Sequence, residues 1–279
     1  MKIDQALLTA RARLSAAAFH PPPREANLLL ATALGWTEAQ LLAHGNDQLE
    51  SGRLEQFEDL LERRLSGEPI AYILGEREFF GRDFHVDDRV LIPRPETEHL
   101  VEVALDLRLP AAPRILDVGT GSGCLAVTLA AELPASRVVA TDLSLGAIRV
   151  AGRNAIRHRV DERIDLVAAD LAAAFDLGPF DLVISNPPYI GRDEATSLSI
   201  EVRDFEPHEA LFAEPTGSSV LGRLTDSLSD LASGTPLLLE IGAGQGEAMA
   251  DLAHVSAFTL EALHPDLAGI DRIARLRRR

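Results

Sequence analysis

The sequence has 279 residues, of which 46% are apolar and 25% are charged, a composition typical of globular proteins rather than of disordered or fibrous chains. Its 27 basic and 43 acidic residues give a formal net charge of -16, which disfavours a broad surface for the phosphate backbone of nucleic acids. The single cysteine, Cys124, excludes an intramolecular disulfide and a cysteine-rich zinc site.

The sequence predicts neither export nor membrane insertion. Charges interrupt residues 1–19 in an amphipathic pattern, unlike the continuous apolar stretch of a signal peptide. No window approaches the roughly 18 uninterrupted apolar residues that a membrane helix needs. We therefore expect a cytoplasmic protein with no membrane partner, and a monomer. The basic run at the C-terminus is expected to be a solvated tail, and it consists of Arg275, Arg277, Arg278 and Arg279.

Residues 1–67 are predicted to form four short helices, because apolar residues recur there at helical spacing. Gly35 follows the second segment, at the position where a glycine commonly ends a helix. Thr37 with Gln40 matches a capping box at the start of the third. These patterns predict a helical domain over residues 1–75, which by itself suggests an interaction module.

A β-hairpin is predicted directly after the helices. Residues 78–86 are rich in aromatic and apolar side chains and have a turn signal near Gly81. Pro95 then stands at the start of a helix, a position that proline favours. We expect residues 76–95 to link the helical domain to a larger domain over residues 96–279.

Strands and helices alternate in this larger domain, a rhythm typical of a doubly wound α/β sheet. The predicted strands are Arg114–Val118, Arg137–Thr141, Ile164–Ala168, Phe180–Ser185, Pro236–Ile241, Phe258–Leu263 and Asp271–Leu276. The last two are separated by too few residues for a parallel crossover, so we expect them to pair antiparallel. The sequence therefore predicts a seven-stranded, mostly parallel sheet with one antiparallel strand, preceded by a small all-α domain.

A glycine-rich loop follows the first strand of this sheet and precedes a helix. Its residues are Asp117, Val118, Gly119, Thr120, Gly121, Ser122 and Gly123. Glycines at such a turn let backbone N–H groups approach a ligand closely. The spacing G-x-G-x-G differs from the dinucleotide fingerprint, and Asp117 would repel a pyrophosphate but favour an α-ammonium group, directly or through water. The loop favours S-adenosylmethionine over NAD, with a tight turn that binds no ligand as the alternative.

Two further carboxylates stand at the ends of predicted strands. Asp142 ends the second strand, where a carboxylate can accept both hydroxyl groups of a ribose. A contact with the following helix at Ser144 is the alternative. Asp170 follows the third strand and is a candidate to bind an adenine amino group, with a turn or a helix cap as its alternative.

The tetrapeptide Asn186-Pro187-Pro188-Tyr189 ends the fourth strand, at the edge of a parallel sheet that faces the ligand crevice. An amide NH2 is a poor nucleophile because its lone pair is delocalised. The Asn186 side-chain oxygen and the Pro187 carbonyl can accept both of its N–H bonds, which would orient the lone pair toward a methyl donor. Tyr189 offers a flat face to a planar amide or base. A proline-rich turn without chemistry is the alternative.

At these motifs the sequence resembles the HemK/PrmC family of protein-(glutamine-N5) methyltransferases, which act on peptide chain release factors. The matching segments are Leu91-Ile92-Pro93-Arg94-Pro95-Glu96-Thr97-Glu98, Asn186-Pro187-Pro188-Tyr189-Ile190, Phe205-Glu206-Pro207-His208-Glu209-Ala210-Leu211, and Glu240-Ile241-Gly242 with Gly244-Gln245-Gly246. The order of helical domain, hairpin and catalytic domain is also that of the family. The resemblance thus extends over nearly the whole chain.

The resemblance implies a class I, Rossmann-like, S-adenosylmethionine-dependent methyltransferase that yields S-adenosylhomocysteine and needs no metal. The implied cofactor residues are Asp117, Gly119, Thr120, Gly121, Ser122, Gly123, Asp142, Asp170, Leu171 and Asn186. The implied pocket for the glutamine of a Gly-Gly-Gln loop consists of Asn186, Pro187, Pro188 and Tyr189, of which Asn186, Pro187 and Tyr189 would be catalytic. Family members often have an aromatic residue in place of Leu171, so apolar packing on adenine would replace stacking here. The helical domain would help to hold the release factor.

Three other functions share parts of these patterns. Amino methylation of adenine or guanine in nucleic acid uses the same Asn-Pro-Pro-Tyr chemistry, but the acidic balance and the 5% of aromatic residues weigh against a direct nucleic-acid partner. A non-catalytic scaffold should have lost at least one of the three motifs. An NAD-dependent dehydrogenase is disfavoured by the glycine spacing.

Overall fold

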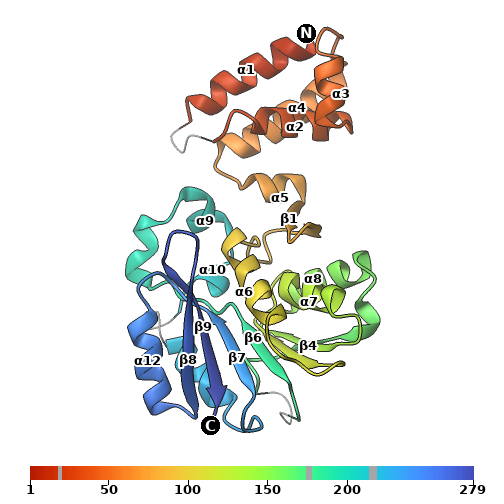
Figure 1. Cartoon of the computed structure of the whole chain (residues 1–279). Coiled ribbons are helices and arrows are strands. Elements are labelled where there is room, and N and C mark those ends of the chain that lie inside the picture. The colour runs from red at the N-terminus through yellow and green to blue at the C-terminus, as the bar shows by residue number, and fades with distance from the viewer. Residues whose placement is uncertain (18–20, 174–177, 214–218) are drawn as a thin grey trace. The chain divides into compact units, whose positions relative to one another are not determined.

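The computed structural model describes residues 1–17, 21–173, 178–213 and 219–279 (Figure 1). The chain divides into two compact units. The first, called here the helical unit, comprises Met1–Gly75 and Leu198–Phe205. The second, called the sheet unit, comprises Glu76–Ser197 and Glu206–Arg279. The chain therefore leaves the sheet unit once and then returns to it.

The helical unit contains α1 (Ile3–Ser15), α2 (Glu25–Leu34), α3 (Glu38–Ala43), α4 (Ser51–Leu65), α5 (Ile70–Leu74) and α9 (Ile200–Phe205). The helices predicted for residues 1–67 are confirmed as α1 to α4. Thr37 and Gln40 form the predicted capping box. Gly35 ends α2 in the left-handed region, with φ of 68°. The apolar faces of α1, α2 and α4 pack into one common core.

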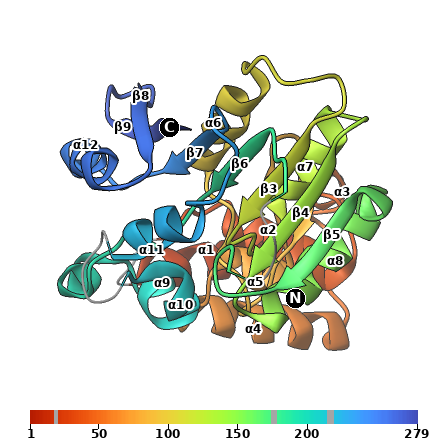
Figure 2. The same cartoon turned by 90° about the horizontal axis from the view of Figure 1, so that it is seen from below.

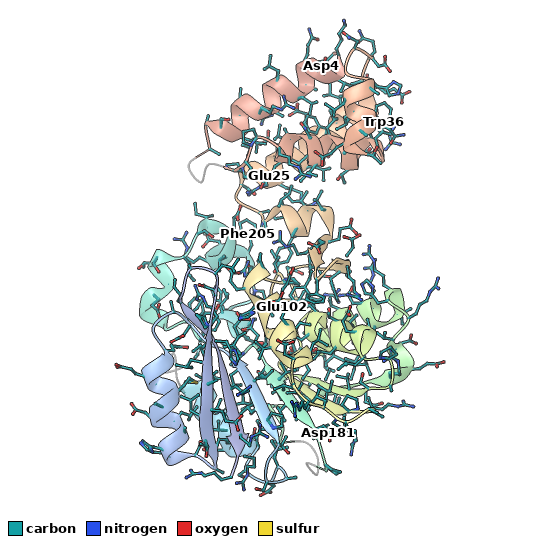
Figure 3. The ribbon with its side chains drawn as sticks, in the orientation of Figure 1. Asp4, Glu25, Trp36, Glu102, Asp181 and Phe205 are labelled. Carbon is teal, nitrogen blue, oxygen red and sulfur yellow. The ribbon has the colours of Figure 1, made fainter. Side chains whose placement is uncertain are left out.

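A buried arginine joins α4 to α2 and α9 within the helical unit. Arg64 is 1% exposed, and its Nε donates to Glu25 Oε2 at 2.6 Å. Its Nη2 pairs with Glu201 of α9. Figure 3 labels Glu25 and Phe205, which belong to the α2 and α9 sides of this unit. Because a buried charge is costly without a partner, this ion network fastens α9 to the helices that precede it.

The sheet unit begins with the predicted hairpin. β1 (Glu76–Phe79) and β2 (Arg82–His85) pair antiparallel, with Phe80 and Gly81 in the turn at positive φ. Helix α6 (Pro95–Leu105) has its proline in the first turn, as predicted. The other helices of the unit are α7 (Cys124–Glu132), α8 (Leu145–Arg157), α10 (His208–Leu211), α11 (Ser219–Ser227) and α12 (Gly246–Val255), with 3-10 helices at Asp161–Arg163 and Arg192–Ser197.

The central sheet has seven strands in the order β5-β4-β3-β6-β7-β9-β8 (Figure 2). The strands are β3 (Arg114–Val118), β4 (Arg137–Asp142), β5 (Ile164–Ala168), β6 (Leu182–Ser185), β7 (Pro236–Glu240), β8 (Phe258–Pro265) and β9 (Asp271–Arg278). The pairs β3·β4, β3·β6, β4·β5 and β6·β7 are parallel. Only β9 is reversed, because it pairs antiparallel with both β7 and β8. The predicted sheet is confirmed.

Helices cover both faces of this sheet. Successive residues of β3 point to opposite faces, so that Ile115 packs with α6, α7 and α8 whereas Leu116 packs with α11 and α12. Because both faces are buried at the centre of the sheet, β3, β6 and β7 are nearly continuous in apolar residues. No helix among the described residues has the length and apolar character needed to span a bilayer.

Three of the four arginines at the C-terminus, Arg275, Arg277 and Arg278, lie in β9 of the sheet rather than in a tail. Arg277 lies in β9 and pairs with Glu261 of β8. Arg278 donates from its guanidinium to the carbonyl oxygen of Ser229. The prediction of a solvated tail was wrong because β9 lies between two strands that supply hydrogen-bonding partners on either side.

Candidate active site

The carboxyl ends of four parallel strands bring most of the predicted site residues, together with Glu240, to one edge of the sheet. β3 leads into the glycine loop, β4 ends at Asp142, β6 leads to Asn186 and β7 ends at Glu240. Strand order proceeds outward from β3 on both sides, so this edge contains the topological switch point at which open α/β sheets bind ligands. Asp181, labelled in Figure 3, precedes β6 at the opposite edge and accepts the N–H of Arg114 at 2.8 Å.

Backbone hydrogen bonds and close packing hold the glycine loop in its turn. The N–H of Gly119 donates to the Thr141 carbonyl at 2.8 Å and so ties the loop to β4. Gly119, Gly121 and Gly123 have φ of 76°, 56° and 81°, in the region that favours glycine. A Cβ on Gly123 would lie 3.0 Å from the Cβ of Ala151, so this glycine lets α7 approach α8.

The other two glycines leave open space beside the backbone. Apart from its chain neighbours, a Cβ on Gly119 or Gly121 would meet no atom of the described residues within 4 Å. Helix α7 begins directly after the loop, at Cys124, so the N–H groups of its first turn are near, and one of them, that of Ala126, hydrogen-bonds to Asp117. A ligand can therefore approach the backbone of the loop closely. On this observation the loop fits S-adenosylmethionine.

Asp117 is fully buried at the end of β3, before the loop. Its Oδ2 accepts the hydroxyl of Thr120 at 2.6 Å. Burial raises the pKa of Asp117 to about 7, while hydrogen bonds from Thr120 and from the backbone of Ala126 act in the opposite direction. The carboxyl group therefore shapes the loop from within, and its contact with an ammonium group stays a prediction.

Asp142 accepts one backbone N–H with each carboxylate oxygen. Oδ2 accepts from Gly121 and Oδ1 from Ser144, both at 2.8 Å. Partial burial raises the pKa of Asp142, and the two hydrogen bonds oppose this rise. Ser144 is itself the cap of α8, since its Oγ accepts the N–H of Ala147 at 3.2 Å. Asp142 thus makes the contact with Ser144 that the sequence offered as the alternative to ribose binding. A carboxylate that accepts two hydrogen bonds still has lone pairs for hydroxyl donors, so this contact leaves room for a ribose.

Asn186 is held by a hydrogen-bonded chain that crosses two other elements. Its Nδ2 donates to Thr97 Oγ1 at 3.1 Å, and Thr97, in the first turn of α6, donates its hydroxyl to Glu240 Oε2 at 2.7 Å. Thr97 and Glu240 are each 2% exposed, whereas Asn186 is half-buried. Burial raises the pKa of Glu240 to about 7. The amide of Asn186 therefore turns its NH2 toward Thr97 and leaves its oxygen for another partner.

The segment after β7 packs against Tyr189. Gln245 Oε1 accepts the N–H of Gly242 at 2.9 Å, and its Nε2 donates to the Tyr189 carbonyl at 3.2 Å. A Cβ on Gly242 would lie 3.1 Å from Tyr189 Cδ2, so this glycine makes room for the ring. Burial raises the pKa of Tyr189 to about 12, so its hydroxyl stays protonated. Both the backbone and the ring of Tyr189 are thereby held in place.

Glu206 connects two further segments that match the family, residues 91–98 and residues 205–211. It is 3% exposed and accepts from Arg94 Nη2 at 2.6 Å and from the N–H of Ile92 at 3.3 Å. Ile190 and Phe212 form an isolated parallel bridge nearby in the chain. The motifs that are far apart in the sequence therefore meet around the end of β6 through hydrogen bonds.

The two residues predicted to bind adenine follow β5. Asp170 Oδ2 pairs with Arg223 Nη2 of α11 at 2.6 Å, and its side chain is 54% exposed. Leu171 has φ of 55°, a left-handed conformation that is uncommon for leucine. It packs against the cluster on the α11 and α12 face. Contact of either residue with adenine stays a prediction, and at Asp170 it would compete with Arg223.

Sequence reasoning assigned no role to Thr97, Glu240 or Asn154. Asn154 of α8 is fully buried, and its Nδ2 donates to the carbonyls of His85 at 2.9 Å and Ser122 at 2.8 Å, which ties the hairpin to the glycine loop. A signal was available, because Asn154 occupies a position within the apolar stripe of α8. For Thr97 and Glu240 the only signal was their presence in matched motifs.

Known proteins match this chain along nearly its whole length. The sequence profile described as PrmC N-terminal domain matches residues 5–75, and that described as Methyltransferase small domain matches residues 97–205. The release factor glutamine methyltransferase of Nitratidesulfovibrio vulgaris is 42% identical over 273 residues, which are 96% of this chain and 92% of that protein. The protein of the same name from Cereibacter sphaeroides is 42% identical over 287 residues, 99% of each chain. This chain also aligns, at 36% identity, with 57% of the bifunctional methyltransferase of Rickettsia typhi.

Solved structures share the fold of this chain. The hMettl16 catalytic domain, in complex with a MAT2A 3'UTR hairpin, has a TM-score of 0.59 at 17% identity, with 79% of this chain and 82% of that chain covered. A methyltransferase from Pyrococcus furiosus has a TM-score of 0.53 at 16% identity, with 79% and 98% covered. At these identities the likeness shows the Rossmann-like fold alone.

Proposed function

Since the chain belongs to the family of release factor glutamine methyltransferases, we propose that it methylates the side-chain nitrogen, N5, of the glutamine in the Gly-Gly-Gln motif of peptide chain release factors. The methyl donor in this proposal is S-adenosylmethionine, and S-adenosylhomocysteine is the product. The observation that carries the proposal is the position of Asn186. Asn186 follows β6, the neighbour of the strand that leads into the glycine loop. Its NH2 group donates to Thr97, so its amide oxygen takes no part in that contact.

The proposed role of the Asn-Pro-Pro corner is to orient a planar NH2 group. The NH2 group of Asn186 donates to Thr97, so its Oδ1 faces the substrate and accepts one N–H of the substrate amide. Pro187 accepts the other with its backbone carbonyl, in a backbone that its ring and that of Pro188 make rigid. Both bonds turn the nitrogen lone pair toward the methyl group and stabilise the positive charge that develops as the N–C bond forms. The C–S bond of the sulfonium would break as the N–C bond forms, which gives a neutral thioether, and release of one N–H proton to solvent would leave a neutral N-methyl amide against Tyr189.

The proposed cofactor site is formed by the glycine loop and the end of β4. Bound S-adenosylmethionine supplies an electrophilic methyl group on a sulfonium. Gly119 and Gly121 let the loop backbone approach the ligand, and Asp142 accepts hydrogen bonds from the ribose hydroxyls. The full proposed set is Asp117, Gly119, Thr120, Gly121, Ser122, Gly123, Asp142, Asp170, Leu171 and Asn186. No step of this chemistry is assigned to a metal.

Nucleic-acid amino methylation is the second candidate, because the hMettl16 domain, with the same fold, was solved with an RNA hairpin. The full-length similarity to release factor glutamine methyltransferases is much higher than this likeness. A net charge of -16 also opposes a large phosphate interface. We therefore propose release factors as the partner and expect a monomer without a direct nucleic-acid partner.

The proposal is tested by incubating the full chain with methyl-labelled S-adenosylmethionine and, in separate reactions, a release factor, total RNA or DNA. We expect label in the release factor alone, and mass spectrometry should place one added methyl group on the Gly-Gly-Gln glutamine. A release factor with that glutamine changed to alanine is the matched control and should remain unlabelled. Label in nucleic acid alone would reject the proposal in favour of the second candidate.

The role of Asn186 is tested with Asn186→Ala. We expect turnover to fall by roughly 10²-fold or more, because both the orientation and the charge stabilisation are lost. Cofactor affinity, measured by calorimetry, should change far less. Asn186→Ala with normal turnover but lost cofactor binding would assign this residue to the cofactor alone.

A further inference from the structure

The hydrogen bonds from Asn186 through Thr97 to Glu240 have a single direction while Glu240 is ionised. A threonine hydroxyl has one hydrogen, and a carboxylate accepts but does not donate. Thr97 therefore donates its hydroxyl hydrogen to Glu240, with 2.7 Å between Thr97 Oγ1 and Glu240 Oε2. Thr97 then offers only lone pairs to Asn186, and the group of Asn186 that can meet them is its NH2.

This direction decides which end of the Asn186 amide faces the substrate. An amide that donates its NH2 to Thr97 presents Oδ1 on its other side, as an acceptor for a substrate N–H. The flipped amide would instead present its NH2 to the NH2 of the substrate, and two donors cannot form a hydrogen bond. The hydrogen bond from Thr97 to Glu240 thus favours the productive orientation of the Asn186 amide over the flipped, unproductive one.

We propose that Thr97 and Glu240 are positioning residues that hold Asn186 with its amide oxygen toward the nitrogen to be methylated. This inference rests on the proposed function. The three residues come from the end of β6, the first turn of α6 and the end of β7, so rigid elements fix both distances. Burial of a carboxylate at 2% exposure is unfavourable for stability unless its hydrogen bonds are satisfied, and the Thr97 hydroxyl supplies Glu240 with one of these bonds.

The charge state of Glu240 makes the direction of the chain sensitive to pH. Burial raises the pKa of Glu240 to about 7. A protonated Glu240 can donate to Thr97, whose hydroxyl can then donate to Asn186 Oδ1 and hold the amide in the flipped orientation. The ionisable groups that act on Glu240 from neighbouring segments are Arg94, Glu96, Cys124, Tyr189 and Arg272. Turnover of the wild type should therefore fall as the pH is lowered through about 7.

The first experiment compares Thr97→Val, which has nearly the same shape without a hydroxyl, with Thr97→Ser, which restores it. We expect Thr97→Val to lower kcat by about tenfold or more, with little change in the KM for the cofactor. Thr97→Ser should recover most of this loss. The fall in kcat as the pH is lowered through about 7 should be steeper in Thr97→Ser than in Thr97→Val, because Asp117, whose pKa is also about 7, titrates in both variants whereas Glu240 acts on Asn186 only in the first.

The matched control is Thr128→Val in α7. Thr128 is also fully buried, and its hydroxyl oxygen has no hydrogen-bond partner among the described residues. This variant loses a buried hydroxyl outside the chain that holds Asn186, so its kcat should equal that of the wild type. Thermal unfolding of all three variants shows whether a loss of kcat reflects a loss of folded protein.

A second measurement needs no substrate. The side-chain NH2 signal of Asn186 in the nitrogen-15 NMR spectrum, assigned with Asn186→Asp, should shift between pH 6 and pH 8 in the wild type, roughly the range that brackets the raised pKa of Glu240. It should not shift in Thr97→Val. Normal kcat in Thr97→Val, or an Asn186 signal that does not respond to pH in the wild type, would overturn the positioning role. A wild type that labels no release factor rejects the proposed function instead, and the NMR signal still decides the direction of the chain.

Discussion

At the scale of single residues, the site fixes each polar group with part of its hydrogen-bonding capacity and leaves the rest for a ligand. Asp142 is held by the N–H groups of Gly121 and Ser144, and Asn186 is held by Thr97. In both cases lone pairs of an oxygen remain for donors from outside. Groups that are held in this way need little reorganisation when a ligand binds.

Asp142→Ala should weaken cofactor binding by about 1.5–3 kcal/mol, the range for hydrogen bonds to a charged group. The substitution also leaves the N–H groups of Gly121 and Ser144 without their acceptor, which loosens the loop. Calorimetric titration with S-adenosylhomocysteine measures the effect, and Asp142→Asn, which keeps one acceptor oxygen, should lose less. Unchanged binding with a lower kcat would mean that Asp142 acts in the methyl transfer.

At the scale of elements, glycine serves two different purposes in one loop. Gly119 has positive φ and open space beside it, so its lack of a side chain is useful to a ligand. Gly123 has positive φ and lies against Ala151, so its lack of a side chain is needed for α7 to pack on α8. The sequence alone presents the two as equivalent members of one motif.

Alanine substitutions should separate these purposes. Gly119→Ala should cost about 1–2 kcal/mol of unfolding free energy for its left-handed conformation, and it should also weaken cofactor binding because the new methyl group fills the approach to the backbone. Gly123→Ala carries the same conformational cost plus about 1–3 kcal/mol for overpacking against α8. Urea unfolding and calorimetry measure the two quantities. Equal losses of stability in both variants would contradict this difference.

At the scale of the whole molecule, the chain passes between its two units more than once. Leu198–Phe205 belongs to the helical unit, whereas the sequence assigned it to a catalytic domain over residues 96–279. The segment follows the Asn-Pro-Pro-Tyr corner in the chain, and Arg64 fastens it to α4 through Glu201. The functional division at residues 75 and 95 stays a prediction.

Arg64→Ala tests how strongly this network holds the helical unit together. Removal of the guanidinium leaves Glu25 buried without its partner, which should lower the unfolding free energy of the unit by about 3–5 kcal/mol. Arg13→Ala is the control because Arg13 pairs with Glu58 and Glu62 at the surface, where such pairs contribute about 1 kcal/mol or less. Urea unfolding followed by the fluorescence of Trp36, which lies between α2 and α3 in the same unit, should show the difference. Similar midpoints for both variants would mean that the buried pair stabilises no more than a surface pair.

The sequence by itself determined α1 to α4, the hairpin, the strands with their directions, and the motifs, because these depend on local properties, whereas α5, α9 and α10 were not predicted. Helical periodicity, apolar runs and the positions of glycine and proline identified α1 to α4, the hairpin and each strand of the sheet. The short connection between β8 and β9 was enough to predict their antiparallel pairing. The residues of the glycine loop and of the Asn-Pro-Pro-Tyr corner were recognisable for the same reason, although their roles await experiment.

Tertiary structure alone decided which side chains meet. Thr97 lies between Asn186 and Glu240, and Arg64 reaches Glu201, only because strand order and helix packing bring distant segments together. Three of the arginines at the C-terminus lie in the sheet because β9 fits between two other strands. Such contacts join residues whose separation in the sequence follows no local period, so their partners are fixed by the topology of the fold.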